Sequence, residues 1–82
     1  MPDLERAILD LLDERAPSTI CPSDVARAVG TAGGWRDLMQ PVRDAAARLA
    51  DRHLVEVTQK DHVVDVRTAR GPVRIRRPST DV

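Results

Sequence analysis

The spacing of the apolar residues changes near His53, and this change constrains the fold more than any other feature of the sequence. Before His53, apolar side chains recur at every third or fourth position, whereas after it they recur at every second position. The first spacing is typical of an amphipathic helix and the second of a strand with one buried face. We therefore expect an α+β fold that is mainly α-helical, with helices first and a β-hairpin last.

Three helical segments are expected before His53. The first follows Asp3, whose side chain is a favourable N-cap. The second begins near Pro22, whose missing N–H costs nothing at the first helical position, and ends at Gly30. The third opens at Trp35 and contains Pro41, so we expect either a kink or a one-turn helix followed by a helix that begins at Pro41. The apolar faces of the first and third segments consist of Leu4, Ala7, Ile8, Leu11 and Leu12, and of Trp35, Leu38, Met39, Val42, Ala45, Ala46 and Leu49.

Two alternating segments after His53 predict the hairpin. Their inward residues are expected to be Val55 and Val57, and Val73 and Ile75. A polar turn at 60–62 and a second turn at 70–72 separate the segments, and the residues between these turns leave room for a third short strand. Earlier in the chain, Thr19 and Ile20 are β-branched but few, enough for one strand-like bridge.

This order of elements is that of a winged helix-turn-helix, three helices with a C-terminal β-hairpin wing. The expected motif has residues 22–29 as its first helix, 41–52 as its second helix and 54–77 as the segment that contains the wing. We expect residues 1–82 to form a single winged-helix domain, with a core over about 4–77 and a frayed tail at 78–82.

Composition narrows the class of protein further. With 82 residues and one aromatic, Trp35, the chain needs a compact aliphatic core, of which Trp35 is expected to be the principal filler. A single cysteine, Cys21, excludes an internal disulfide and fits a reducing cytosol. No apolar run is long enough for a membrane span or a signal peptide. We therefore expect a cytoplasmic protein without membrane contact.

The side chain of Cys21 has two readings. It precedes Pro22 at a helix N-terminus, where the helix dipole lowers a thiol pKa and would suit a redox sensor, or it is a packed or capping residue. His53 and His62 are the other possible zinc ligands. No two of these three residues have the short spacing that is typical of a metal site, so no metal is expected.

The neutral total charge hides an uneven distribution. The chain has 13 basic and 13 acidic side chains. Residues 1–40 contain four basic and seven acidic side chains, a charge of −3, and residues 41–82 contain nine basic and six acidic ones, a charge of +3. Such asymmetry is typical of a surface that binds nucleic acid or another polyanion.

The second motif helix is one candidate for DNA contact. Its outward positions are expected to be 43, 44, 47, 48, 51 and 52, where Arg43 and Arg48 would reach guanine edges. Asp44 and Asp51 on the same face would repel phosphates, and alternating signs are also typical of a solvated, salt-bridged helix. Both readings remain open from the sequence.

The arginine-rich wing is the stronger candidate. Arg74 and Arg76 would share the strand face opposite the core, with Lys60 and Arg70 at turn tips. The alternative is an edge strand that is charged to prevent sheet-to-sheet pairing. Stacking of single-stranded nucleic acid is disfavoured because the one aromatic lies on a core stripe. The candidate DNA-binding residues are Arg43, Arg48, Arg52, Lys60, Arg70, Arg74 and Arg76.

Two short motifs lie in the predicted helix-turn-helix and wing. The segment 20–27 reads I-C-P-S-D-V-A-R, and the segment 70–74 reads R-G-P-V-R. Both resemble motifs of a family of small uncharacterised bacterial domains, an I-C-P-S-x-V-A-R signature and an R-G-P-(I/V)-R end. Further similar positions are Trp35, Arg36, Leu38, Met39, Val42, Arg43 and Leu49. The resemblance covers about residues 4–77 and implies a winged-helix fold, but no activity.

No residues combine into a catalytic constellation. Asp10, Asp13 and Glu14 form a solvated helix face, and Gly33 and Gly34 lack a phosphate-loop motif, so neither an enzyme nor a cofactor is expected. Two functions remain. The domain binds duplex DNA, as a transcriptional regulator or nucleoid-type accessory protein, or it is a protein-interaction or structural module without DNA affinity. The sequence leaves open whether it is a monomer or a homodimer.

Overall fold

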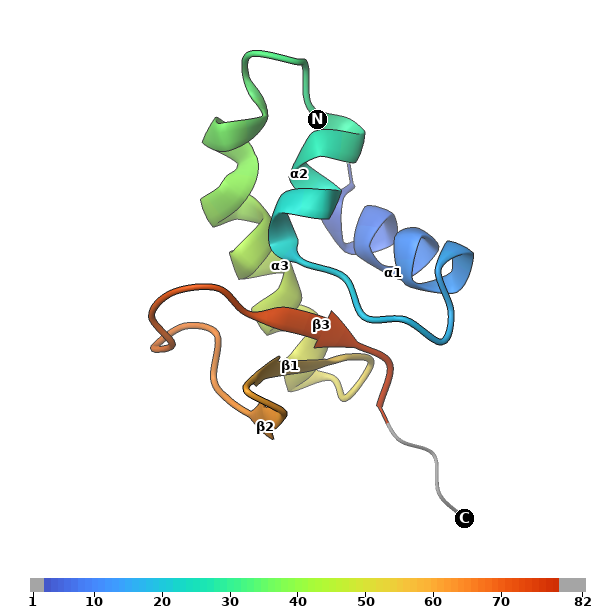
Figure 1. The fold of residues 1–82 in the computed structure, drawn as a ribbon, viewed down its shortest axis with the longest axis vertical. Helices are drawn as coiled ribbons and strands as arrows, with labels where there is room; N and C mark the ends of the chain where they lie inside the picture. Colours follow the sequence, from blue (N-terminus) through green and yellow to red (C-terminus); the bar gives the residue numbers. More distant parts are fainter. Residues whose placement is uncertain (1–2, 79–82) are drawn as a thin grey trace.

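The computed structural model describes residues 3–78 and confirms the α+β fold (Figure 1). Three α-helices, a 3-10 turn and three strands follow one another in this range. Their bounds are α1 (Leu4–Glu14), α2 (Pro22–Val29), η1 (Trp35–Leu38), α3 (Met39–Asp51), β1 (Glu56–Gln59), β2 (His62–Val63) and β3 (Arg74–Arg76). The last four residues of the expected tail, 79–82, lie outside the described residues.

The helix ends follow from local chemistry. The Asp3 carboxylate accepts a hydrogen bond from the backbone N–H of Arg6 at 3.1 Å, which confirms the predicted N-cap of α1. Cys21 is the N-cap residue of α2, and its backbone N–H donates to the Asp24 carboxylate at 2.9 Å. Pro22 occupies the first helical position as predicted.

The helical region is not interrupted at Pro41 itself. The chain forms the one-turn helix η1 and then α3, which starts at Met39, two residues before the predicted start at Pro41. Proline is tolerated at the third position of α3 because the first four backbone N–H groups of a helix have no intrahelical acceptor.

The sheet is antiparallel with strand order β2-β1-β3. Val57 lies opposite Ile75, and Ile20 pairs with the other side of Ile75 through backbone bonds of 2.9 and 2.7 Å. This is the single bridge that the sequence predicts. Lys60 and Asp61 both have positive φ, 49° and 67°, as the central residues of a type I′ hairpin turn do. The additional strand, β2, is therefore the short strand that follows this tight turn and pairs with β1. The complete domain has a winged-helix-like α+β fold.

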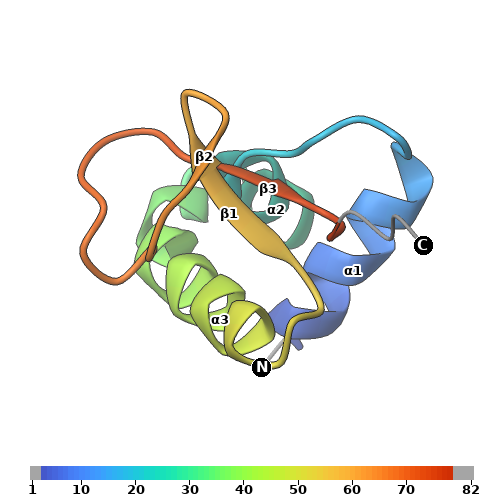
Figure 2. The same ribbon diagram turned by 90° about the horizontal axis from the view of Figure 1, so that it is seen from below.

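The core is aliphatic and lies between the three helices and the sheet (Figure 2). Its largest fully buried side chains are Ile8, Leu12, Ile20, Leu49, Ile75, Val25, Val42, Val55, Val57 and Val73. Trp35 is only partly buried and packs against the edge of this cluster. The prediction that Trp35 is the principal core filler was therefore wrong: the core is filled by aliphatic side chains, and η1 lies at the end of the helical layer (Figure 1).

The outward face of α3 also differs from the prediction at one position. Ala47 is 2% exposed, although the sequence analysis assigned it to the outward face. The segment that returns from β2 runs beside α3 and buries Val66 in the same core cluster (Figure 2). The wing thus covers a side of α3 that local periodicity leaves to solvent.

Candidate nucleic-acid interface

The seven candidate DNA-binding residues divide into two sets according to the charge of their partners. Three have a carboxylate partner, and we call them the paired cations: Arg48, Arg52 and Arg76. Four have no carboxylate partner among residues 3–78, and we call them the wing cluster: Arg43, Lys60, Arg70 and Arg74. The division matters because a neutralised arginine attracts phosphate less than one whose charge is uncompensated.

Two of the paired cations lie on α3 and reach back to α1. Arg48 Nε donates to Glu5 Oε2 at 2.8 Å, and Arg52 donates to the other oxygen of the same carboxylate. The hydrogen bond from Arg48, with the charges of both guanidinium groups, lowers the pKa of Glu5 below its ordinary value. Both side chains are therefore held toward α1 rather than left free on the outward face of α3.

Asp51, at the end of α3, has an arginine partner as well. The Arg67 guanidinium donates to both oxygens of Asp51, at 3.1 and 2.7 Å, in the fork geometry of a bidentate pair. This hydrogen bonding lowers the pKa of Asp51 and raises that of Arg67. In the sheet, Arg76 Nε donates to Glu56 Oε1 at 2.9 Å across the β1–β3 register. The pair of Asp51 and Arg67 fixes the wing segment to α3.

Arg43 joins α3 to the wing without losing its charge. Its guanidinium donates to the backbone carbonyls of Ala69, at 3.0 Å, and of Gly71, at 3.3 Å. These acceptors are neutral, so they orient the guanidinium but do not compensate it. Asp44, next on the helix, accepts from the Gln40 amide at 2.9 Å.

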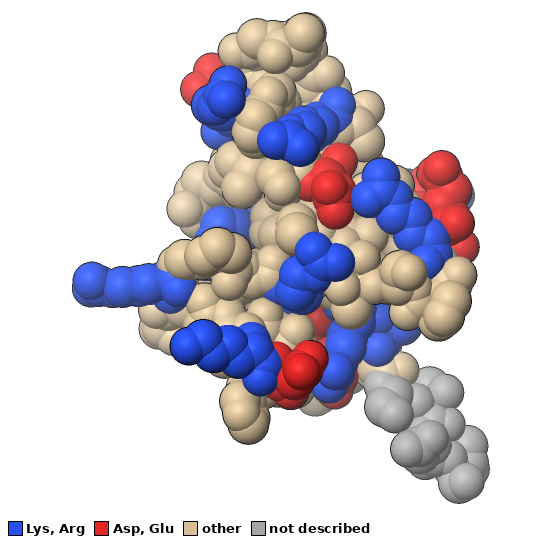
Figure 3. All heavy atoms as spheres, in the orientation of Figure 1, with Lys and Arg blue, Asp and Glu red and all other residues tan. Residues whose placement is uncertain are grey.

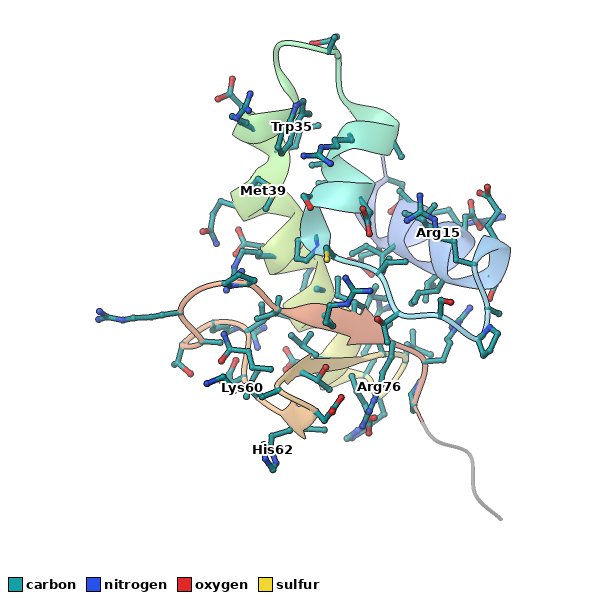
Figure 4. The ribbon with its side chains drawn as sticks, viewed as in Figure 1. Arg15, Trp35, Met39, Lys60, His62 and Arg76 are labelled. Carbon is teal, nitrogen blue, oxygen red and sulfur yellow. The ribbon has the colours of Figure 1, made fainter. Side chains whose placement is uncertain are left out.

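In the sequence, Arg70 lies between Ala69 and Gly71, whose backbone carbonyls accept hydrogen bonds from Arg43. On the other side of the loop, Gln59 Nε2 donates to the carbonyls of Arg70, at 2.6 Å, and Pro72, at 3.2 Å. Gln59 directly precedes Lys60 at the hairpin turn, so these hydrogen bonds tie that turn to the loop that contains Arg70 and contacts Arg43. The Arg70 and Lys60 side chains are exposed, and Lys60 projects from the wing in Figure 4.

Arg74 links the wing to the start of α2. Its guanidinium donates to the hydroxyl and the carbonyl of Thr19, at 2.8 and 3.1 Å, and to Cys21 Sγ. None of these three acceptors is a carboxylate, so Arg74 belongs to the wing cluster. Cys21 is thus half-buried and in contact with β3, and it caps α2.

The distribution of charge over the molecule follows these pairs. Figure 3 shows basic side chains across the face in view and projecting from the wing on its left, while the largest acidic group lies on its right. Figure 1 has the same orientation, and α1 lies on that side of the ribbon. Acidic groups also lie among the basic ones elsewhere on this face, and arginines of the second half of the sequence pair with acids of the first half, so the two halves of opposite charge are brought together rather than separated.

Sequence reasoning missed the environment of Trp35. The guanidinium of Arg27 lies 4.5 Å from the centre of the indole ring and that of Arg36 lies 4.6 Å from it. Such cation–π contacts orient two further basic groups without neutralising them. The adjacent Arg36 was a signal in the sequence, but the contact with Arg27 depends on how α2 and η1 pack.

Residues 3–78 contain neither a candidate metal cluster nor a candidate membrane span. No group of three or more His, Cys, Asp or Glu side chains in this range could hold a metal ion. No helix of the described part of the chain is long and apolar enough to cross a membrane.

Comparison with known proteins identifies a family but no activity. No curated protein matches the chain. A family model does: residues 2–78 match the model described as "Protein of unknown function (DUF3253)". Because this match covers nearly the whole sequence, the chain belongs to the DUF3253 family.

Proposed function

We propose that this domain binds duplex DNA, without a catalytic step, by holding phosphates with the wing cluster. The observation that carries the proposal is that four cations, Arg43, Lys60, Arg70 and Arg74, lie on the wing or contact it and have no carboxylate partner within residues 3–78. Contacts to phosphate supply most of the affinity for non-specific DNA, and arginine suits them because of its forked donors. A cytoplasmic transcriptional regulator or nucleoid-type accessory protein fits such a surface.

In this proposal, side chains on the outward face of α3 make few contacts with base edges. Arg48 and Arg52 are engaged by Glu5, Arg43 by the wing loop, and Asp44 is an exposed acid on the same helix. Direct readout needs free donors that reach base edges in the major groove. We therefore expect DNA binding that depends strongly on salt and weakly on sequence.

The test is the affinity for random duplex DNA as a function of salt. If the four cations of the wing cluster each neutralise one phosphate, a plot of log affinity against log salt should have a slope of about −4, since each contact contributes about −0.9. Absence of binding at about 50 mM salt with tens of micromolar protein would overturn the proposal, because non-specific sites bind in that range. The protein-interaction or structural module would then be the remaining function.

Two double variants separate the wing from α3. Lys60→Ala with Arg70→Ala removes two exposed, unpartnered cations, and we expect the slope to become less steep by about 2. The matched control, Arg48→Ala with Arg52→Ala, also removes two arginines, but these two share the Glu5 carboxylate and carry a net charge of +1, so we expect the slope to change by at most about 1. The reverse result would assign DNA contact to α3 instead of the wing.

A further inference from the structure

A groove of about 440 Å³ opens where the start of α2, the first turns of α3 and the wing loop meet. Segments that are far apart in the sequence form its walls, Cys21–Ser23 on one side and Gly71–Val73 on the other. Its volume lies within the range of about 300–1,000 Å³ that is usual for small-molecule sites. In Figure 4 the labelled Met39 marks its α3 side, between the level of Trp35 and the wing.

The lining of the groove is mainly apolar. Pro22 and Val73 are buried, and Met39 and Pro72 present hydrocarbon to the open side. Methionine adapts its shape to a bound apolar group because its side chain is unbranched and flexible. The groove can therefore hold an aliphatic body several carbons long.

Cationic donors at the edge of the groove complement this apolar lining. Arg43 lines it, and the two hydrogen bonds from its guanidinium to backbone carbonyls leave three of its five N–H groups unused. Arg74 donates to Cys21, which also lines the groove, so a second uncompensated guanidinium stands nearby. None of the residues that line the groove is acidic. An occupant with a negative head and an apolar body satisfies both features.

We propose that this groove binds a small aliphatic monocarboxylate. The carboxylate would accept hydrogen bonds from the free N–H groups of Arg43, and the chain would lie along Met39 and Pro72. A carboxylate matches the planar donor fork of arginine better than a neutral hydroxyl does. The site goes beyond DNA binding, and its test needs no DNA.

The test uses three probes of the same chain length: octanoate, octan-1-ol and octylammonium. Each is titrated into the protein while amide nitrogen–proton NMR spectra are recorded. We expect octanoate to cause saturable shifts of the amides of Cys21, Ser23, Met39, Arg43 and Gly71, with an affinity on the order of tenfold above that of the alcohol. Octylammonium should leave these amides unshifted because Arg43 and Arg74 repel it. Equal binding of the acid and the alcohol would overturn the proposal, as would the absence of saturable shifts with octanoate.

A pair of variants tests the location of the site. Met39→Glu places a negative charge in the groove at the first position of α3, where the helix dipole favours an acid, so we expect the helix to persist. The control, Gln40→Glu, adds the same charge at the next position, which is exposed and outside the groove lining. Octanoate binding should fall at least tenfold in Met39→Glu and by much less in Gln40→Glu. The ligand-free spectra show whether each variant is folded, and equal binding by the two folded variants would place the site elsewhere.

Discussion

At the scale of single residues, Gly30 shows how a correct prediction can have a different cause. The sequence predicts a helix end at this glycine, and Gly30 is the C-cap residue of α2. Its φ of −94° is open to any residue, so left-handed freedom is not the reason for glycine here. A Cβ at this position would lie 2.8 Å from the carbonyl oxygen of Ala26 and 2.9 Å from Cα of Trp35. Glycine is needed because η1 passes close to the end of α2.

The substitution Gly30→Ala should therefore destabilise the domain. Backbone atoms surround the new methyl group, so relieving the overlap requires η1 to move from α2, and we expect a loss of about 1–3 kcal/mol in the free energy of unfolding. Urea unfolding measures the change. The control is Gly33→Ala, where nothing lies within 4 Å of the new methyl group and stability should stay within about 1 kcal/mol of the wild type. Equal stability of the two variants would contradict the close approach of η1.

At the scale of elements, one carboxylate joins two helices. Glu5 on α1 binds both Arg48 and Arg52 on α3, and hydrogen bonding by Arg48 lowers the pKa of Glu5. A carboxyl group whose pKa is lower in the folded state stabilises the fold above its unfolded pKa, about 4.3 for glutamate. This stabilisation is lost as the pH falls through the folded pKa of Glu5.

Glu5→Gln tests this link between α1 and α3. We expect the wild type to be more stable than the variant near pH 7 and the difference to shrink as the pH falls below about 4.3. Thermal unfolding across this pH range measures the difference. Asp10→Asn is the control, because among residues 3–78 Asp10 pairs only with Arg6, also on α1, and its loss leaves the contact with α3 intact. A difference between wild type and Glu5→Gln that does not vary with pH would contradict the ion pair.

At the scale of the whole molecule, stability depends on an aliphatic core that both layers share. Ile75 is fully buried and lies between Ile20, which precedes α2, and Val57 on β1. A domain of this length has a total stability of about 4–12 kcal/mol, so one core side chain is a large fraction of it.

We expect Ile75→Ala to cost about 2–5 kcal/mol of unfolding free energy, because it leaves a cavity where the bridge and the sheet meet. Ile75→Val keeps most of the volume and should cost about 0.5–1.5 kcal/mol. Urea unfolding followed by circular dichroism gives both values. A loss below 1 kcal/mol for the alanine variant would show that Ile75 does not join the two layers.

Packing between elements explains where the sequence analysis was wrong. Periodicity assigned Trp35 to the centre of the core and Ala47 to solvent, because it describes one helix at a time. Trp35 lies at the edge because η1 is at the end of the helical layer, and Ala47 is buried because the wing returns beside α3. Both outcomes depend on neighbours that the local pattern does not contain.

The sequence by itself determined the elements, their order and the inward faces of α1 and β3, because helix caps, proline positions and apolar spacing act within a few residues. Only the tertiary structure decided which arginines are neutralised. Arg48 and Glu5 are 43 residues apart, and Arg43 and Gly71 are 28 apart, so no local pattern links them. The candidate surface therefore keeps Arg43, Lys60, Arg70 and Arg74 and loses Arg48, Arg52 and Arg76. Charge is carried by the sequence, but its compensation depends on the fold.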